Sequence, residues 1–164
     1  MTNYFTTKRP FIWGSIIFLV ICQACLREKP TELYHKFPGN QWDRFNLLSF
    51  EIPVEKANGT WDIFLFAYFT CEYQYETLDF NMDLRTTAGE ERINEYKMKV
   101  KSKEGKLLGE VKGDSCQLSI TLKQQLKISK PGILKIEIEN LIPRMATQGI
   151  SGVGIRMVRS GEQE

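Results

Sequence analysis

The chain has 164 residues, of which 42% are hydrophobic and 12% aromatic, and this length and composition suit one domain with a sizeable core. The formal net charge is +2, and the first 25 residues contribute Lys8 and Arg9 and no acids. Removing these two cations takes the net charge from +2 to 0. The remainder therefore has no basic excess that would indicate nucleic-acid binding.

The N-terminal stretch has the order of an export signal. Lys8-Arg9 precedes an apolar run from Phe11 to Cys22, and a small residue then meets a cysteine at Ala24-Cys25. The run is shorter than the about 20 residues that a spanning helix needs, whereas a basic start, a short apolar run and small residues near the cleavage site typify a signal peptide. A buried core helix is the alternative. We predict a lipoprotein signal peptide over residues 1–24.

Two cysteines compete as the lipidated residue. Cys25 has the small Ala24 before it, and Cys22 has Leu19 at the third position back but bulky Ile21 just before it. The adjacent residue must fit a small peptidase pocket, which favours lipidation of Cys25. Export without lipid is the other interpretation. Residues 25–40 are interpreted as the lipidated N-terminus and a polar tether, and residues 41–160 as the folded domain.

The remaining cysteines, Cys71 and Cys116, would lie in an oxidising compartment, where they could form a disulfide. Two buried free thiols are the alternative, since the sequence does not show that they are within bonding distance. With one distant histidine, His35 in the tether, they make no recognisable metal-ligand set. We expect no metal and no cofactor.

After Trp42 the hydrophobic period is two rather than 3.6, which predicts strands. The run from residue 61 to 70 is apolar on both faces, as expected of a central or covered strand. Residues 124–129 could hold a helical turn at most. Turn signals separate the runs. The expected strands are Phe45–Val54, Trp61–Thr70, Leu78–Arg85, Tyr96–Lys101, Leu118–Lys123, Leu134–Glu139 and Val153–Met157, with a short one in Lys106–Val111.

Seven or eight strands at this spacing predict an all-β fold, an antiparallel β-sandwich, of which the jelly roll is one form. One register can be proposed for the hairpin around Ala88-Gly89. Pairing positions whose numbers sum to 180 sets Asp83 opposite Lys97, Asp79 opposite Lys101 and Arg85 opposite Glu95. Opposite charges across a pair are favourable, so a charge-matched outer face is expected. On this interpretation the lysines at 97, 99, 101 and 103 form a solvated strand face rather than a phosphate site.

The sequence shows no convincing catalytic constellation. A Ser-His-Asp arrangement would depend on His35 alone. Asp79 and Asp83 could imitate a glycosidase carboxylate pair, but a structural role on the charged face is favoured. The Gly-rich stretch 149–154 precedes a strand rather than opening a helix, so it lacks the context of a phosphate loop. We predict that the protein is not an enzyme.

Aromatic richness raises carbohydrate binding as an alternative. The side chains that could line a platform are Trp42, Trp61, Tyr68, Tyr73 and Tyr75. In a β-sandwich most such rings are expected in the core, so an exposed aromatic row would favour sugar binding and burial of the rings would count against it.

Three stretches in order resemble one family. They are Gln41-Trp42-Asp43-Arg44-Phe45, then Cys71-Glu72-Tyr73-Gln74-Tyr75-Glu76-Thr77-Leu78, and finally Pro143-Arg144-Met145 followed by the stretch from Gln148 to Arg156. After a lipid signal, this order resembles the gliding-motility lipoprotein H family of Bacteroidetes. The sequence departs from the family at Lys106–Glu110, which lacks the family's tryptophan, and at Arg144-Met145, where the family usually has Met-Arg.

The resemblance implies an accessory lipoprotein of the gliding apparatus, which in that phylum is linked to type IX secretion. Its implied partners are the membrane, through the N-terminal lipid, and envelope proteins of the gliding or secretion machinery. Leu26-Arg27-Glu28-Lys29 is mixed in charge rather than acidic, which favours a periplasm-facing anchor. We therefore expect a non-catalytic, lipid-anchored protein-interaction domain, with a carbohydrate-binding surface lipoprotein as the alternative.

Overall fold

The computed structural model describes residues 29–56 and 59–161. The predicted signal peptide and Cys25 lie outside the described residues. Within them the fold is all-β, as predicted, with eleven strands and one 3₁₀ turn. The elements are β1 (Thr31–Lys36), η2 (Pro38–Asn40), β2 (Gln41–Asp43), β3 (Leu48–Val54), β4 (Gly59–Phe69), β5 (Thr77–Arg85), β6 (Glu91–Lys99), β7 (Glu110–Lys112), β8 (Ser115–Ile128), β9 (Gly132–Asn140), β10 (Ala146–Gln148) and β11 (Ile150–Arg159).

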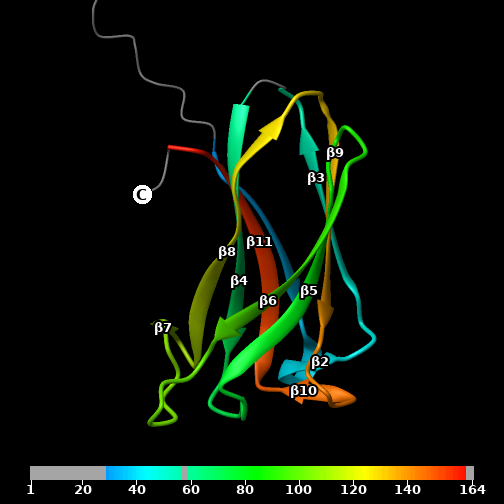
Figure 1. Cartoon of the computed structure of the whole chain (residues 1–164). Helices are drawn as coiled ribbons and strands as arrows, with labels where there is room; N and C mark the ends of the chain where they lie inside the picture. Colours follow the sequence, from blue (N-terminus) through cyan, green and yellow to red (C-terminus); the bar gives the residue numbers. More distant parts are fainter. Residues whose placement is uncertain (1–28, 57–58, 162–164) are drawn as a thin grey trace, which may run out of the picture.

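Two antiparallel sheets face each other (Figure 1). One has the strand order β1-β11-β4-β8-β7 and the other β3-β9-β5-β6, while β2 and β10 form a separate ribbon. If β7 and the ribbon are set aside, the eight long strands numbered in chain order give sheets 1-8-3-6 and 2-7-4-5. This is the strand order of a jelly roll, so the predicted sandwich is confirmed and its topology is now defined.

The core lies between the sheets and follows the predicted alternation. In β5, the even-numbered residues Leu78, Phe80, Met82 and Leu84 are at most 1% exposed, while their odd-numbered neighbours face outward. Strand β4 is central in its sheet, between β11 and β8, which agrees with its apolar residues on both faces.

The domain starts earlier than the sequence predicted. The segment assigned to a tether contains β1, which pairs with β11 over six residues from Thr31↔Met157 to Lys36↔Gly152. Phe37, which follows it, is only 2% exposed. Most β1 side chains are exposed because it is an edge strand, so backbone pairing rather than an apolar stripe holds it. The predicted domain boundary at residue 41 therefore moves to Thr31.

The β5–β6 hairpin forms as predicted, but in a different register. Its pairs sum to 176, with Asp79 opposite Lys97, Asp83 opposite Ile93 and Arg85 opposite Glu91. The predicted sum of 180 is wrong because the turn is tight: Gly89 has φ +88°, and its amide donates to the Thr86 carbonyl at 2.9 Å. Turn geometry fixes hairpin register, and a shift of four leaves each side chain on its expected face.

Residues 124–129 form no helical turn and continue β8 instead. The strand is interrupted by a bulge at Gln125, which has φ +51°. The buried carboxylate of Asp62 accepts bonds from the Gln125 amide at 2.8 Å and the Ser160 hydroxyl at 2.7 Å. A side chain from the neighbouring strand thus satisfies the backbone that the bulge frees.

Candidate functional site at the closed end of the sandwich

One end of the sandwich, which we call the closed end, is covered by the β2–β10 ribbon (Figure 1). The ribbon pairs Trp42 with Thr147 and Gln41 with Gln148. The Trp42 ring is fully buried and stacks on Phe37, with ring centroids 5.3 Å apart. Its Nε1 donates to the Asn46 carbonyl at 2.9 Å. The ribbon is therefore anchored by a buried pair of stacked rings, Phe37 and Trp42, and the indole N–H of Trp42 has a hydrogen-bond partner.

A buried polar pair fixes the chain as it enters the ribbon from β9. Asn140 and Thr147 are at most 1% exposed. The Asn140 amide donates to Thr147 Oγ1 at 2.9 Å, and its carbonyl oxygen accepts from the Ile142 amide at 3.0 Å. A satisfied buried network of this kind favours one conformation over others.

Tyr73 packs under the same end from the β4–β5 connection. It is fully buried, lies edge-on to Phe69 with centroids 4.8 Å apart, and donates its hydroxyl proton to the Thr77 carbonyl at 2.7 Å. Burial, followed by the charge of Asp79, raises the pKa of the Tyr73 phenol above its usual range. Gly149, with φ +84°, passes so close that a Cβ there would lie 2.1 Å from the Tyr73 amide nitrogen.

The structure brings the three family-like stretches together at this end. The first supplies β2, the second contains Tyr73, and the third supplies Met145, Gln148 at the end of β10, and Gly149. Backbone bonds join them, from Gly149 N to Asn40 O at 2.8 Å and from Thr70 N to Gly149 O at 2.9 Å. Segments separated by about a hundred residues in sequence therefore build one rigid unit.

On its outside this unit exposes three large apolar side chains, which we call the apolar tip. Phe45 is 79% exposed, Met145 71% and Leu47 53%. The Arg44 amide donates to the Met145 carbonyl at 3.0 Å, so the two loops that carry the tip lie side by side. Sequence reasoning missed this feature, because Phe45 and Leu47 were included in the strand expected over Phe45–Val54 and were not considered as an exposed apolar group.

Two guanidinium groups flank the tip. Arg44 and Arg144 are exposed, and neither belongs to a salt bridge found within residues 29–56 and 59–161. The carboxylate of Asp43 is engaged by the Gln41 amide at 2.6 Å. The arrangement offers apolar contact and charge-assisted hydrogen bonds to an external group.

The two cysteines considered for a possible disulfide, Cys71 and Cys116, are free in the structure. Cys71 is exposed in the turn after β4, and Cys116 is half-buried in β8, where it pairs with Phe69. The alternative of two buried thiols therefore does not describe Cys71. No group of three or more His, Cys, Asp or Glu side chains in the described ranges is placed to hold a metal ion.

The five rings considered for a carbohydrate platform do not form one row. Trp42 and Tyr73 are fully buried, and Trp61 and Tyr75 pack partly against the core. Tyr68 alone lies on an aromatic outer surface, on the five-stranded sheet. There Tyr34, 47% exposed, stacks on Phe66 and meets the Tyr68 ring edge-on at 5.6 Å.

The Gly-rich stretch serves this surface. Gly152 lies under Tyr34, whose hydroxyl oxygen would be 2.1 Å from an added Cβ, and Gly154 lies under Phe66 with a corresponding distance of 2.3 Å. Both glycines allow rings from the paired strands to lie flat on the sheet. Their role is packing between strands, in agreement with the expectation that the stretch is not a phosphate loop.

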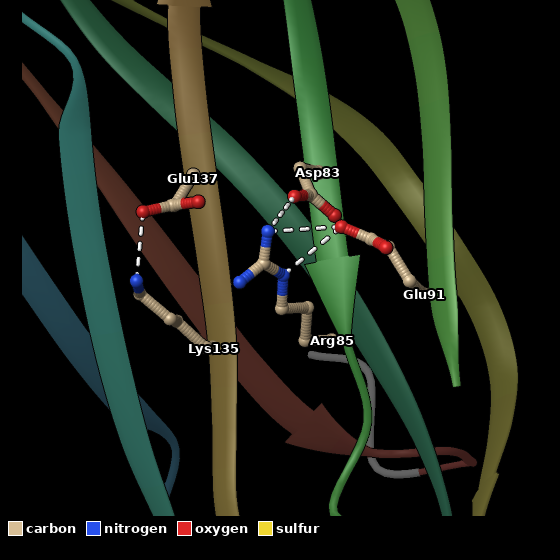
Figure 2. Close-up of polar contacts among 5 residues, drawn as sticks. All are labelled: Asp83, Arg85, Glu91, Lys135 and Glu137. Carbon is tan, nitrogen blue, oxygen red and sulfur yellow. Dashed lines mark hydrogen bonds and ion pairs between the residues drawn. The ribbon is translucent and has the colours of Figure 1, made fainter. Parts of the chain in front are cut away.

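The candidate carboxylates Asp79 and Asp83 lie on the outer face of the four-stranded sheet. Asp79 pairs with Lys97 at 3.2 Å, and Asp83 with Arg85 at 3.1 Å. Figure 2 shows the Arg85 guanidinium between Asp83 and Glu91, beside the Lys135–Glu137 pair of β9. The Asp83 charge, followed by that of Glu91, raises the pKa of Arg85. Each carboxylate has a cation beside it, which is the charge matching that the sequence predicted, with different partners.

His35 belongs to β1, where it pairs with Val153 and packs on Phe37 with ring centroids 5.1 Å apart. No helix within the described part of the chain is long and apolar enough to cross a membrane.

These features define a jelly-roll module with one rigid, closed end that presents apolar side chains to solvent. Residues 30–157 match the GldH lipoprotein family, so the chain belongs to that family. It is a lipoprotein of a group related to gliding motility, and the predicted resemblance is confirmed. No curated protein matches the chain.

Solved structures add only a distant likeness. Two structures of infectious bursal disease virus, the Gx and Gt strains, align at 12% identity with TM-scores of 0.36 and 0.37, covering 83% of this chain. The VP2 subviral particle of the same virus aligns at 15% identity with a TM-score of 0.37. The chain spans about a third of the length of these viral chains, with coverage of 33%, 33% and 34%.

Proposed function

We propose that the chain is a lipid-anchored envelope protein, attached through Cys25, and that it acts as a non-catalytic interaction component of an assembly linked to gliding or type IX secretion. The observation that carries the proposal is the coincidence of the family-like stretches with the apolar tip. The stretches that support the family contain two of the three tip residues, Phe45 and Met145, and the Arg44–Met145 backbone bond joins the loops that carry them.

The tip has the physical character of a protein contact. Scattered single apolar residues on a surface need no explanation, but a contiguous group marks an interaction site. Aromatic, Met and Arg side chains are also enriched in such contacts. The loops are held by Trp42 and by the Arg44–Met145 backbone bond, so a partner would meet a preorganised surface and little ordering entropy would be lost on binding.

The chemistry of the tip supports a binding role rather than catalysis. Its exposed side chains are Phe, Leu, Met and Arg. None of these is a nucleophile or a general base near neutral pH. In this proposal the domain faces the periplasm, because the residues after Cys25 are mixed in charge rather than acidic.

The test is photo-crosslinking in intact cells of the source species. A photoreactive amino acid replaces Phe45 in one strain and Ile93 in another, since Ile93 is 69% exposed on β6, away from the tip. Adducts from position 45 with gliding or secretion subunits, absent from position 93, are the expected result. Adducts to no protein from any surface position would contradict an assembly role.

A matched pair of variants sharpens the result. Phe45→Ser with Met145→Ser should reduce recovery of the partner about tenfold or more, as expected for an interface hot spot. Ile93→Ser with Val111→Ser, which also changes two exposed apolar residues, should leave recovery unchanged. Equal losses in both variants would move the contact away from the tip.

A carbohydrate-binding surface lipoprotein is the second candidate, and the half-exposed Tyr34 beside Tyr68 favours it. If the captured protein brings down polysaccharide and no protein, and Tyr34→Ala abolishes that recovery, the carbohydrate role replaces the assembly role.

A further inference from the structure

The end of the sandwich opposite to the apolar tip is where the described chain begins (Figure 1). We call it the N-terminal end. Thr31 pairs with Met157 there, Val54 at the end of β3 pairs with Gly132 at the start of β9, and Gly59 pairs with Ile128. The two ends of the described chain and the β5–β6 and β8–β9 connections therefore meet at one end, where β3 also ends and β4 begins.

The early start of β1 changes how this end relates to a membrane. Five residues separate Cys25 from Thr31, and a fully extended segment of that length spans at most about 20 Å. A tether reaching residue 40 would have allowed about 50 Å. If Cys25 carries the lipid, as the proposed function requires, the N-terminal end must lie close to the bilayer surface.

Cations gather at this end. Lys29, Lys127 and Lys130 are exposed, and none of the three belongs to a salt bridge found among the described residues. Exposed Lys56 and half-buried Arg159 also lie at this end, and each interacts with another group of the chain. The five cations come from four separate segments that are brought together only by the fold.

The acids at the same end do not balance these cations. Glu90 pairs with Arg92 at 2.9 Å, and Glu91 shares the guanidinium of Arg85 with Asp83, so three carboxylates are paired with two cations at the β5–β6 hairpin. Glu55 is exposed beside the lysines, and the carboxylate of Asp62 is buried at the same end. Among the described residues of this end, cations therefore outnumber carboxylates.

A groove of about 410 Å³ opens between β1, β3 and β4 at this end. Lys29 and Lys56 contribute to its lining, together with Ile52, Trp61 and Met157. Ammonium groups beside apolar side chains match the chemistry of a phospholipid, whose phosphate is anionic and whose adjoining part is apolar.

We propose that the N-terminal end docks on anionic phospholipid headgroups, and that this contact holds the domain upright on the membrane. Each lysine near an anionic surface strengthens association about fivefold. Strand β4 has 11 residues and a rise of about 3.3 Å per residue, so the apolar tip then stands about 35 Å from the bilayer. The docked end orients the molecule and leaves the opposite end free for a partner.

The experiment is amine footprinting of the acylated, full-length protein. The protein is reconstituted into vesicles of phosphatidylcholine alone or of phosphatidylcholine with about one-third phosphatidylglycerol, and treated with a membrane-impermeant amine reagent. Mass spectrometry then measures labelling at each lysine. We expect labelling of Lys127 and Lys130 to fall severalfold in the anionic vesicles, and to recover at high salt. Lys103 and Lys106, exposed in the β6–β7 connection, should be labelled equally in both.

A pair of variants distinguishes charge-dependent docking on the bilayer from closeness that the lipid anchor alone imposes. Lys127→Gln with Lys130→Gln should remove the protection of Lys29 in anionic vesicles, whereas Lys103→Gln with Lys106→Gln should preserve it. Equal labelling of Lys130 in neutral and anionic vesicles would overturn the docking proposal while leaving the lipid anchor intact. Loss of the protein from neutral vesicles would overturn the anchor itself, and with it the proposed function.

Discussion

The two ends of the sandwich are stabilised in different ways. At the closed end a dedicated ribbon covers the core, and the polar atoms of Trp42, Asn140 and Thr147 find partners inside. At the N-terminal end the strands run into turns, and the buried Nε1 of Trp61 has no hydrogen-bond partner among the described residues. The closed end is thus stabilised by interior packing and buried hydrogen bonds, whereas the main feature of the N-terminal end is its surface charge. Substitutions should therefore affect stability far more at the closed end.

The largest expected effect comes from two glycines that share a conformation. Gly149 at the closed end and Gly89 at the N-terminal end have φ values of +84° and +88°. Gly149→Ala places a methyl group 2.1 Å from the Tyr73 amide nitrogen, whereas Gly89 has nothing within 4 Å. We expect Gly149→Ala to lower the free energy of unfolding by about 3 kcal/mol or more, and Gly89→Ala by about 1 kcal/mol.

Urea denaturation of both variants measures this difference. The Gly89 variant is the control, because it carries the cost of a positive φ without the clash. Equal losses in the two variants would mean that the closed end relaxes around the added methyl group and avoids the clash with Tyr73.

The tryptophans provide a second comparison between the ends. Trp42→Phe and Trp61→Phe remove the same atoms. The Trp42 N–H donates to the Asn46 carbonyl, whereas the Trp61 N–H is buried and has no partner within residues 29–56 and 59–161. Removing an unsatisfied buried donor relieves a desolvation cost, and removing a bonded one leaves its acceptor unpaired. We expect Trp42→Phe to cost about 2 kcal/mol more than Trp61→Phe.

Thermal and urea unfolding of the two variants should agree on the order. If Trp61→Phe proved the more destabilising, the N-terminal end would also be stabilised by interior packing, and the contrast between the ends would fail.

Much of the fold could be predicted from the sequence, because sheet faces follow a simple rule. Alternation placed Phe80, Met82 and Ile136 correctly in the core, and it survived the register error because the shift was even. The alternation of apolar and polar residues does not specify which residues pair across neighbouring strands. The β5–β6 register depends on the tight turn at Gly89, and β1 depends on backbone bonds to β11, so neither was visible as an apolar pattern.

The site was harder to predict than the fold for the same reason. Phe45 was expected to begin the strand that runs to Val54, yet it lies outside β3 and is 79% exposed. Tyr73 and Trp42 were considered for a sugar platform, although the core was expected to hold most such rings, and both are fully buried. The resemblance identified the right stretches, but only their convergence at one end separates the residues that hold the site from those that it exposes.

The raised pKa of Tyr73 predicts that the protein becomes less stable at alkaline pH. Burial raises the pKa of Tyr73 above its value in an unfolded chain, so the folded state binds this proton more tightly. The stabilisation is complete below about pH 10 and falls as the pH rises further, because the unfolded tyrosine ionises first. The free energy of unfolding should decline there by up to about 1.4 kcal/mol per pH unit.

Tyr73→Phe tests this linkage. At pH 7 the variant loses the hydrogen bond to the Thr77 carbonyl, at a cost of about 1 kcal/mol. Between about pH 10 and 11 its stability should decline less steeply than that of the parent protein. Parallel curves would assign the alkaline loss to other groups, such as lysines, and remove Tyr73 as its source.

The smallest effect is expected on the charged sheet face between the two ends. Lys97 is 63% exposed and pairs with Asp79 at 3.2 Å, and exposed pairs contribute at most about 1 kcal/mol. Lys97→Gln should therefore change the free energy of unfolding by about 0.5 kcal/mol. Lys103→Gln is the control, because Lys103 forms no ion pair with another described residue. A loss well above 1 kcal/mol would show that surface charge contributes strongly to folding. In that case the lysines of the N-terminal end could serve stability, and lipid binding would no longer be needed to explain them.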